Sequence, residues 1–538
     1  MNQRTIILIA IFFTLFILWN QWEAKQYVDT NGNTTVKTTF ANTSSITTNT
    51  GADVPSVIST NTDLETPGVS AVKDNNILVS TDVLTLEISP VGGTVQNAKL
   101  NDYPEYLHSD EAFVLLNSTP GFVFVAESGL ASANNALPNH LSEFQSEQKQ
   151  YQMNGDNLTV SLLWEGDSGI SVKKNFRFKK GSYAITVDYD INNASSQLIP
   201  AKSYTRLTRT GGSDSNMMMP TFTGGVVYDP ATDSVQKNDF DDWGDFQTLK
   251  AQGGWMAITQ QYFIAGWIPN QNETQIYSSS TKNGLYKLTN ENPQISIPAG
   301  TQANLSANEL YLGPKEYGNI EKIAAGMNYT LDYGWLDILA SPLSWAMHKI
   351  NDVVDSWGWS IILITVLIKI IFYPLSEKSY RSMAGMRKLA PRMEHIKKTY
   401  GDDRQKLGQK TMELYKKEKV NPASGCLPIL VQIPVFIAFY WMLLDTVELR
   451  QTEFWWISDL ADMDPYFILP IIMGASMFVQ QKLNPPPPDP MQAKIMMSLP
   501  FVFTVMFLWF PAGLVLYWVV NNILSIAQQW AMNKRVNG

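Results

Sequence analysis

A single charged residue lies inside one of the most apolar stretches of this sequence. Lys369 is the only charged side chain between Ile361 and Tyr373. A charge near the centre of a bilayer costs about 2.5–3.5 kcal/mol on insertion scales, so such residues usually face a helix-bundle interior or a water-filled cavity. Thr365 lies one helical turn before Lys369, on the same face. A lysine stem that reaches the nearby membrane surface explains this residue alone equally well.

Polar residues in later apolar runs favour the cavity. Gln432 lies between Pro428 and Pro434, and the last apolar run carries four polar residues toward its C-terminal end: Asn521, Asn522, Ser525 and Gln528. Each of them could serve only as a hydrogen-bonding contact between helices. Together with Lys369 they favour a hydrated, positively charged groove that opens toward the cytoplasmic leaflet.

Other chemistry has no support in the sequence. No Walker A, HExxH, GxSxG or CxxC pattern occurs, and the four histidines are scattered along the chain. The acidic run between Asp239 and Asp245 lacks EF-hand spacing. The one cysteine, Cys426, excludes an intramolecular disulfide. We therefore expect no enzyme activity, no catalytic residue, no metal and no cofactor.

Five apolar segments follow residue 356, and they must position the polar residues. Several are shorter than the ~20 residues that cross a hydrocarbon core of about 30 Å, which indicates a locally thinned bilayer. A sixth apolar run near the N-terminus lacks a small-residue cleavage pattern, so it predicts an uncleaved signal anchor over residues 1–22. The five later segments lie at 359–375, 427–444, 466–479, 495–510 and 514–527.

Charge is distributed unevenly along the 538 residues, whose formal net charge is -9. Residues 23–358 carry 20 basic and 36 acidic side chains, whereas residues 359–538 carry 19 and 13. Segment 376–421 alone has 13 basic and 6 acidic residues. Because basic loops remain in the cytoplasm, we predict six spans, with both termini cytoplasmic and the acidic part outside. The acidic balance of the whole chain argues against DNA as a partner.

The basic segment 376–421 has a helical pattern of its own. Apolar residues recur every three or four positions from Met386 to Tyr400, and Gly401, Asp402 and Asp403 predict a turn. We expect a cytoplasmic helical hairpin whose charge could contact anionic lipid, ribosomal RNA or an arriving chain. A solvated basic loop with no partner is the alternative.

The exported part divides into three segments. Residues 23–74 are rich in Thr, Asn and Ser and predict a flexible linker. Residues 75–325 alternate apolar and polar side chains, most clearly from Tyr183 to Asn192, and predict one large antiparallel β-sandwich. Residues 326–355 predict an amphipathic helix in the membrane interface, with a helix packed on the sandwich as the alternative.

Several motifs resemble the YidC membrane protein insertase family of Gram-negative bacteria. The most specific is the run from Lys419 to Pro428, Lys-Val-Asn-Pro-Ala-Ser-Gly-Cys-Leu-Pro, followed by Gln432 and Pro434. Further matches lie at residues 357–360, 373–375, 447–450, 489–492 and 509–517. The resemblance implies a β-supersandwich similar to sugar mutarotases in the periplasm and a five-helix insertase core over residues 356–538.

The same resemblance implies a function and its residues. A family member inserts integral proteins into the inner membrane and helps them to fold, alone or with the Sec translocon, and it uses no nucleotide. The implied partners are nascent membrane proteins, the Sec translocon with its accessory subunits, the ribosome and membrane lipids. The implied groove residues are Lys369, Thr365, Gln432, Tyr517 and Trp518. Lys369 stands at the family's intramembrane arginine, so it keeps the charge but loses the bidentate fork.

Two functions of other classes make different demands on the sequence. A small-solute transporter with a periplasmic binding domain would usually show repeated halves, and no internal repeat is visible. A membrane-tethered sugar enzyme would need an acid/base pair in the sandwich, and no convincing pair emerges from the sequence.

Overall fold

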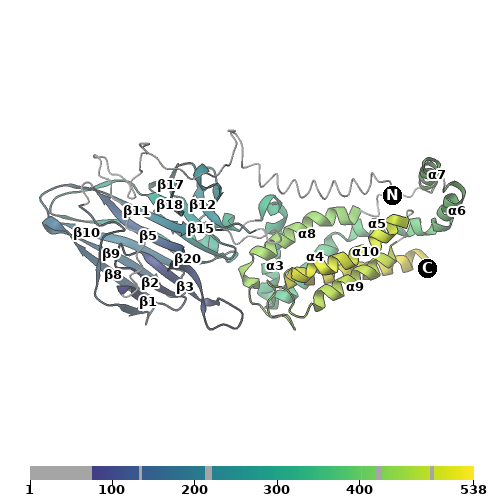
Figure 1. Cartoon of the computed structure of the whole chain (residues 1–538), viewed down its shortest axis with the longest axis horizontal. Helices are drawn as coiled ribbons and strands as arrows, with labels where there is room; N and C mark the ends of the chain where they lie inside the picture. The colour runs from purple at the N-terminus through teal and green to yellow at the C-terminus, as the bar shows by residue number, and fades with distance from the viewer. Residues whose placement is uncertain are drawn as a thin grey trace, which may run out of the picture. The chain divides into compact units, whose positions relative to one another are not determined.

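A computed structural model describes residues 75–132, 136–212, 221–331, 333–401, 403–418, 427–484 and 490–537. The chain forms two compact units, of which one ends at Asp332 and the other runs from Tyr333 to the C-terminus. The first is built from strands and the second from helices (Figure 1). The predicted signal anchor, the predicted linker and most of the Lys419 to Pro428 motif lie outside the described residues.

The first β-sheet of the strand unit has 11 strands, in the order β14-β17-β18-β11-β5-β4-β3-β2-β1-β7, with β19 paired to β11. Its pairs are antiparallel, as predicted, except that β1 and β7 run parallel. The strands are β1 (Ile77–Ser80), β2 (Leu84–Ile88), β3 (Val95–Pro104), β4 (Ala112–Thr119), β5 (Phe122–Ser132), β7 (Gln150–Gln152), β11 (Ile199–Thr210), β14 (Leu249–Gln252), β17 (Thr274–Lys282), β18 (Leu285–Glu291) and β19 (Ile295–Ile297).

The second sheet has nine strands, all antiparallel, in the order β13-β12-β15-β16-β20-β10-β9-β8-β6. Short helices η3 (Asp167–Gly169), η4 (Trp243–Asp245), α2 (Ile320–Ile323) and η5 (Met327–Thr330) complete the unit. The strands are β6 (Gln145–Ser146), β8 (Asn157–Glu165), β9 (Ile170–Lys179), β10 (Ala184–Asn193), β12 (Gly224–Asp229), β13 (Ser234–Asp239), β15 (Trp255–Thr259), β16 (Phe263–Ile268) and β20 (Thr301–Pro314).

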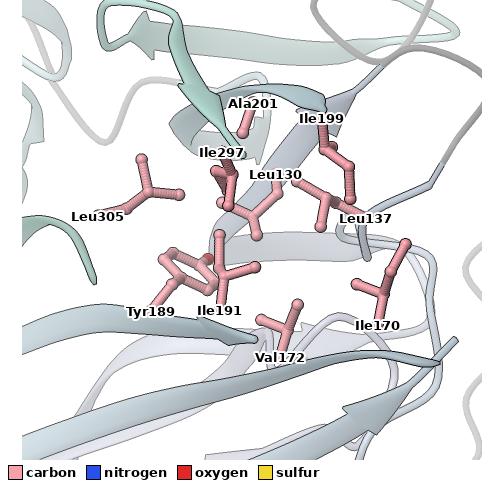
Figure 2. Close-up of a cluster of buried hydrophobic side chains, with 10 residues drawn as sticks. All are labelled: Leu130, Leu137, Ile170, Val172, Tyr189, Ile191, Ile199, Ala201, Ile297 and Leu305. Atoms are coloured by element: carbon pink, nitrogen blue, oxygen red, sulfur yellow. The ribbon is translucent and has the colours of Figure 1, made fainter. Parts of the chain in front are cut away.

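The core of the strand unit lies between the two sheets. Figure 2 shows Leu130 and Ala201 of the first sheet facing Val172, Tyr189 and Ile191 of the second, and all five are buried. The alternation that predicted a strand near residue 183 is confirmed, because the alternate residues of β10 are the ones that face this core. The apolar pattern of the sequence therefore sets which face of each strand is inside.

One tight turn shows how local sequence fixes strand pairing. Asn283 and Gly284 connect β17 to β18 with φ values of 54° and 74°. A two-residue hairpin loop of type I′ needs positive φ at both positions, and Asn-Gly adopts it at the lowest cost. The local sequence thus fixes this turn and the pairing of the two strands that it joins.

The helical unit contains a short element η6 (Gly334–Leu336) and nine described α-helices. The last helix is longer than the predicted segment 514–527, because polar residues continue its helical turns. The described elements are α3 (Asp337–Val354), α4 (Trp357–Ile371), α5 (Tyr373–Lys388), α6 (Ala390–Tyr400), α7 (Arg404–Lys417), α8 (Leu427–Asp445), η8 (Val447–Leu449), α9 (Ile468–Leu483), α10 (Pro490–Met506), η9 (Phe507–Trp509) and α11 (Ala512–Asn537).

Within the described part of the chain, no single helix combines the length and the hydropathy of a full membrane span. The helix Trp357–Ile371 and the segment Tyr373–Met383 reach that threshold together, as a pair bent by 66°. The bend separates the apolar helix α4 from the more polar helix α5, at the point where the sequence changes from an apolar run to the basic segment.

Helix α11 is the centre of the helical unit. It packs against α4, α5, α8 and α9, while α10 packs against α9. Gly474 allows the close approach of α9 and α10, because a Cβ atom at this position would overlap with Thr504 Oγ1. These contacts place the polar residues of α4, α8 and α11 in one region.

Helices α6 and α7 lie on either side of the predicted turn at residues 401–403. Asp403 caps α7, since its Oδ1 accepts hydrogen bonds from the backbone N–H groups of Gln405 and Lys406 at 3.1 and 3.0 Å. An ion pair of 2.5 Å between Arg392 and Glu418 joins the two helices. The pattern of the basic segment therefore corresponds to two helices that pair through a tight connection.

Helix α3 packs against α4 and α8. Met347, from the predicted apolar face, is buried in this contact together with Ala340. The exposed side of the helix is also apolar in part, because Ile338, Trp345 and Val353 are 81%, 56% and 85% exposed. The helix thus has two apolar surfaces, of which the contacts within the helical unit cover only one.

Candidate functional site

A small pocket lies where helices α4, α5 and α8 meet. Its wall is mostly apolar, and Lys369 and Gln432 are two of its polar members. The space open to the centre of a water molecule is about 20 Å³, which is enough for one or two waters and far too small for a polypeptide segment. The lining residues are Ile368, Lys369, Phe372, Leu375, Ser376, Val431 and Gln432.

Lys369 is half-buried on α4 and reaches across to α11. Its Nζ donates a hydrogen bond of 2.7 Å to Ser525 Oγ. The Ser525 hydroxyl in turn donates to the backbone carbonyl of Asn521 at 2.7 Å, so its lone pairs face the ammonium. Among the described residues, no carboxylate lies within ion-pair distance of Lys369. The positive charge is therefore held by a neutral hydroxyl.

Gln432 makes a second connection to the same helix. Its Nε2 donates to the side-chain oxygen of Asn521. Asn521 and Ser525 are four residues apart, which puts them on one face of α11. Helices α4 and α8 are thus each tied by one hydrogen bond to a single polar face of α11.

The other three predicted groove residues do not line the pocket. Thr365 is fully buried, and its hydroxyl donates to the carbonyl of Ile361 on its own helix at 2.6 Å. Tyr517 is buried with its ring centroid 4.5 Å from that of Phe439. Trp518 is half-buried and meets Phe436 edge to face, with centroids 4.5 Å apart. The structure brings together Lys369 and Gln432 of the predicted set.

The polar residues near the end of α11 fall into two sets with different partners. Asn522 Nδ2 donates to Ser476 Oγ of α9 at 3.0 Å. Gln529 Nε2 donates to the carbonyl of Leu483 at 3.2 Å and to Asn484 Oδ1 at 3.0 Å, at the C-terminal end of α9. Asn522, which the sequence places with the groove residues, therefore connects α11 to α9 and contributes no bond to the pocket residues.

One residue of this site, Ser376 of α5, was not predicted from the sequence. Asn521 and Ser525, which the sequence groups with Lys369 as polar groove residues, hold Gln432 and Lys369. Their signal is a pair of polar side chains spaced i, i+4 within an apolar helix. The sequence contains no such signal for Ser376, because the 66° bend after α4 brings that residue to the pocket.

A second buried lysine lies in the strand unit. Lys174 of β9 is fully buried, and its Nζ donates to the carbonyl oxygens of Gly92, Gly93 and Ser128 at 2.7, 3.1 and 3.0 Å. Burial lowers the pKa of Lys174 to about 7, and attraction to Glu127 offsets this shift in part. All its acceptors are backbone groups, so this lysine fixes the turn at residues 91–94 against two strands.

Metal coordination has no counterpart in the described residues, which contain no group of three or more His, Cys, Asp or Glu side chains suited to hold an ion. The arrangement around Lys369 is instead that of a single ammonium in a polar notch between apolar helices. Such a site can attract and orient a carboxylate.

Family models match nearly all of the described chain. One, described as 60Kd inner membrane protein, matches residues 349–538, and another, described as YidC periplasmic domain, matches residues 76–346. A membrane protein insertase YidC from Vesicomyosocius okutanii is 52% identical, over 100% of this chain and 99% of that protein.

More distant proteins carry the same name. The membrane protein insertase YidC of Methylobacillus flagellatus is 42% identical, over 99% of this chain and 97% of that protein. A solved structure of an active YidC insertase with its first transmembrane domain resolved is 18% identical, covers 84% of this chain and 92% of its own, and gives a TM-score of 0.40.

Proposed function

Because this chain belongs to the YidC family of membrane protein insertases, we propose that its pocket around Lys369 is where an acidic segment of a nascent inner-membrane protein enters the membrane. The ammonium of Lys369 supports this proposal most directly. It lies among apolar helices and has a neutral hydrogen-bond partner, so a carboxylate that arrives from a substrate would be its first ionic partner in the described part of the chain.

In this mechanism the groove lowers a barrier and supplies no energy. A polar segment that crosses a thinned bilayer through a hydrated notch does not lose all of its water at once. The driving force is the transfer of the substrate's apolar helix into lipid, at about 0.8 kcal/mol for each buried CH₂ group. Gln432 adds a hydrogen-bonding group beside Lys369, and the substrate path continues past the aromatic residues Tyr517 and Trp518, which pack against α8 beyond the pocket.

The proposed topology follows the charge distribution. Six spans place both termini and the basic hairpin of α6 and α7 in the cytoplasm, and the strand unit in the periplasm, with a domain boundary near residue 325. Helix α3 lies in the periplasmic interface, and its exposed Ile338 and Trp345 support this, since apolar side chains with a Trp are typical of helices there.

Partners are assigned to surfaces by charge. The basic hairpin receives the chain as it leaves the ribosome and contacts anionic lipid. Action alone or together with the Sec translocon and its accessory subunits is also part of the proposal. A small-solute transporter is not favoured, because relatives that match this chain over its full length carry the name of insertases.

The decisive experiment replaces Lys369. We expect Lys369→Leu to reduce insertion of a substrate with an acidic translocated segment at least tenfold, because an ion pair at about 4 Å contributes several kcal/mol at an effective dielectric constant of about 20. Lys369→Arg should retain insertion, since it keeps the charge. The measurement is protection of the translocated segment from protease in proteoliposomes.

Two controls separate the charge from other effects. Lys494→Leu removes an exposed lysine of α10 and should leave insertion unchanged. A substrate whose acidic residues are replaced by Asn and Gln should insert equally well with wild type and Lys369→Leu. Full insertion of the acidic substrate by Lys369→Leu would refute the electrostatic role of the groove. Crosslinking from positions 365, 432 and 517 to stalled nascent chains maps the path independently.

A further inference from the structure

The pocket around Lys369 is small, and two of its lining residues, Lys369 and Gln432, are bonded to helix α11. Its free space of about 20 Å³ must widen before any polypeptide segment can enter. Lys369 Nζ bonds to Ser525 Oγ at 2.7 Å, and Gln432 Nε2 bonds to Asn521 Oδ1. Both bonds end on the same face of α11, so separation of that face from α4 and α8 breaks both.

Neighbouring polar positions of α11 have different partners. Asn522 bonds to Ser476, and Gln529 bonds to the end of α9, at positions that do not line the pocket. These bonds join α11 to α9 and involve neither α4 nor α8. The bonds of Lys369 and Gln432 join α11 instead to α4 and α8, two of the three helices that line the pocket.

The Ser525 hydroxyl is oriented in advance for its role. Its proton is directed to the carbonyl of Asn521 one turn earlier, at 2.7 Å, which leaves its oxygen as an acceptor for the ammonium. A hydrogen bond to a charged group contributes about 1.5–3 kcal/mol, and a carboxylate is a better acceptor for an ammonium than a hydroxyl is. A carboxylate of an acidic segment can thus replace Ser525 as the hydrogen-bond acceptor of the Lys369 ammonium. A neutral segment has no acceptor that is better than the Ser525 hydroxyl.

We propose that Ser525 and Asn521 are positioning residues that latch Lys369 and Gln432 across the closed groove, so that the groove opens readily only for a segment that brings a carboxylate to Lys369. This inference rests on the proposed function and adds a source of selectivity to it. In the closed state the latch also keeps the lysine stem extended toward α11, instead of toward the cytoplasmic surface.

The first test measures closure without any substrate. Cys426 is the only cysteine of the chain, so Cys426→Ser provides a cysteine-free background in which Val431→Cys reports on the pocket wall. The rate of its reaction with a water-soluble, membrane-impermeant thiol reagent is measured on the full chain in proteoliposomes. We expect Ser525→Ala to raise this rate roughly tenfold, and Asn521→Ala to raise it less, because that bond joins neutral groups.

Matched variants distinguish a latch from a general loss of packing. Ser525→Thr keeps a hydroxyl and should keep the slow rate. Ser476→Ala and Asn522→Ala remove the same chemical groups from the contact between α9 and α11 and should leave the rate unchanged. An unchanged rate in Ser525→Ala, or an equal increase in Ser476→Ala, would overturn the latch.

The second test measures selectivity. Each variant is tested with an acidic substrate and with the same substrate whose acidic residues are replaced by Asn and Gln. The insertion yield of the first divided by that of the second should be roughly fivefold lower in Ser525→Ala than in wild type, and close to the wild-type value in Ser525→Thr. The two proposals fail in different ways. Normal insertion of the acidic substrate by Lys369→Leu removes the proposed function, whatever the labelling rates are. A ratio that Ser525→Ala leaves unchanged, while Lys369→Leu still blocks insertion, removes only the latch.

Discussion

The buried Lys174 makes the stability of the strand unit depend on pH. In the folded chain its pKa is about 7, against an ordinary value of 10.5, because burial disfavours the charged form. Between these two pH values the unfolded chain holds a proton that the folded chain has released. Stability therefore rises with pH across this window, by at most about 1.4 kcal/mol per pH unit.

The size of the effect follows from the two pKa values. Between pH 7 and pH 9 the unfolded chain keeps the Lys174 proton that the folded chain progressively loses. Summed over this interval, the difference raises the free energy of unfolding by about 2 kcal/mol. Above pH 10 the trend should reverse. Burial raises the pKa of Tyr189 and Tyr277, so these side chains stay protonated in the folded chain after they have ionised in the unfolded chain. The free energy of unfolding therefore falls as the pH rises further. We thus expect maximal stability of the strand unit near pH 9 to 10.

Urea unfolding of the full chain in detergent, followed by a short pulse of protease, measures this stability. Lys174→Met removes the titrating group, so its free energy of unfolding should lack the gain between pH 7 and 9. Lys173→Met is the matched control, since Lys173 is the exposed neighbour on the same strand and should keep the wild-type slope. Equal slopes for wild type and Lys174→Met would refute the assignment of the pH dependence to the buried ammonium.

Two further substitutions test the helical unit. Gly474→Ala should lower the stability of this unit by about 1–3 kcal/mol, because the new Cβ overlaps with Thr504 Oγ1. Adding Thr504→Ala to this variant should restore much of the lost stability. Thermal unfolding of the purified chain measures both effects. Asp464→Ala should cost about 1–2 kcal/mol, since Asp464 Oδ2 accepts from the N–H of Leu469 at 2.6 Å in the first turn of α9. Hydrogen exchange that is no faster at the start of α9 would contradict this capping role.

The strand unit could largely be predicted from the sequence. Alternation of apolar and polar residues identifies β10, and Asn283-Gly284 identifies the hairpin between β17 and β18. The parallel pairing of β1 with β7 could not be predicted, because the two strands are separated by some seventy residues and β7 has only three residues with no apolar alternation.

The candidate site was predictable only in part. Lys369 and Gln432 stand out as polar residues in apolar runs, and the structure places both on one pocket. Thr365 shares the helical face of Lys369, yet its hydroxyl satisfies its own backbone, an option open to every helical threonine. Asn521 bonds to α8 and Asn522 bonds to α9, a difference that depends on which helices pack around α11. The periodicity of a single helix gives no information about its neighbours.

The sequence by itself determined that a single charge lies within an apolar run of this chain, and the cost of burying an ammonium makes Lys369 conspicuous there. It also determined the family and the alternating order of the strand unit. Only the tertiary structure decided what holds that charge. Ser525 lies 156 residues away along the chain, and the packing of α11 against α4 brings its hydroxyl to 2.7 Å from the ammonium. Hydrogen bonds act over a few ångströms in space, whereas sequence patterns report only on neighbours along a helix or strand.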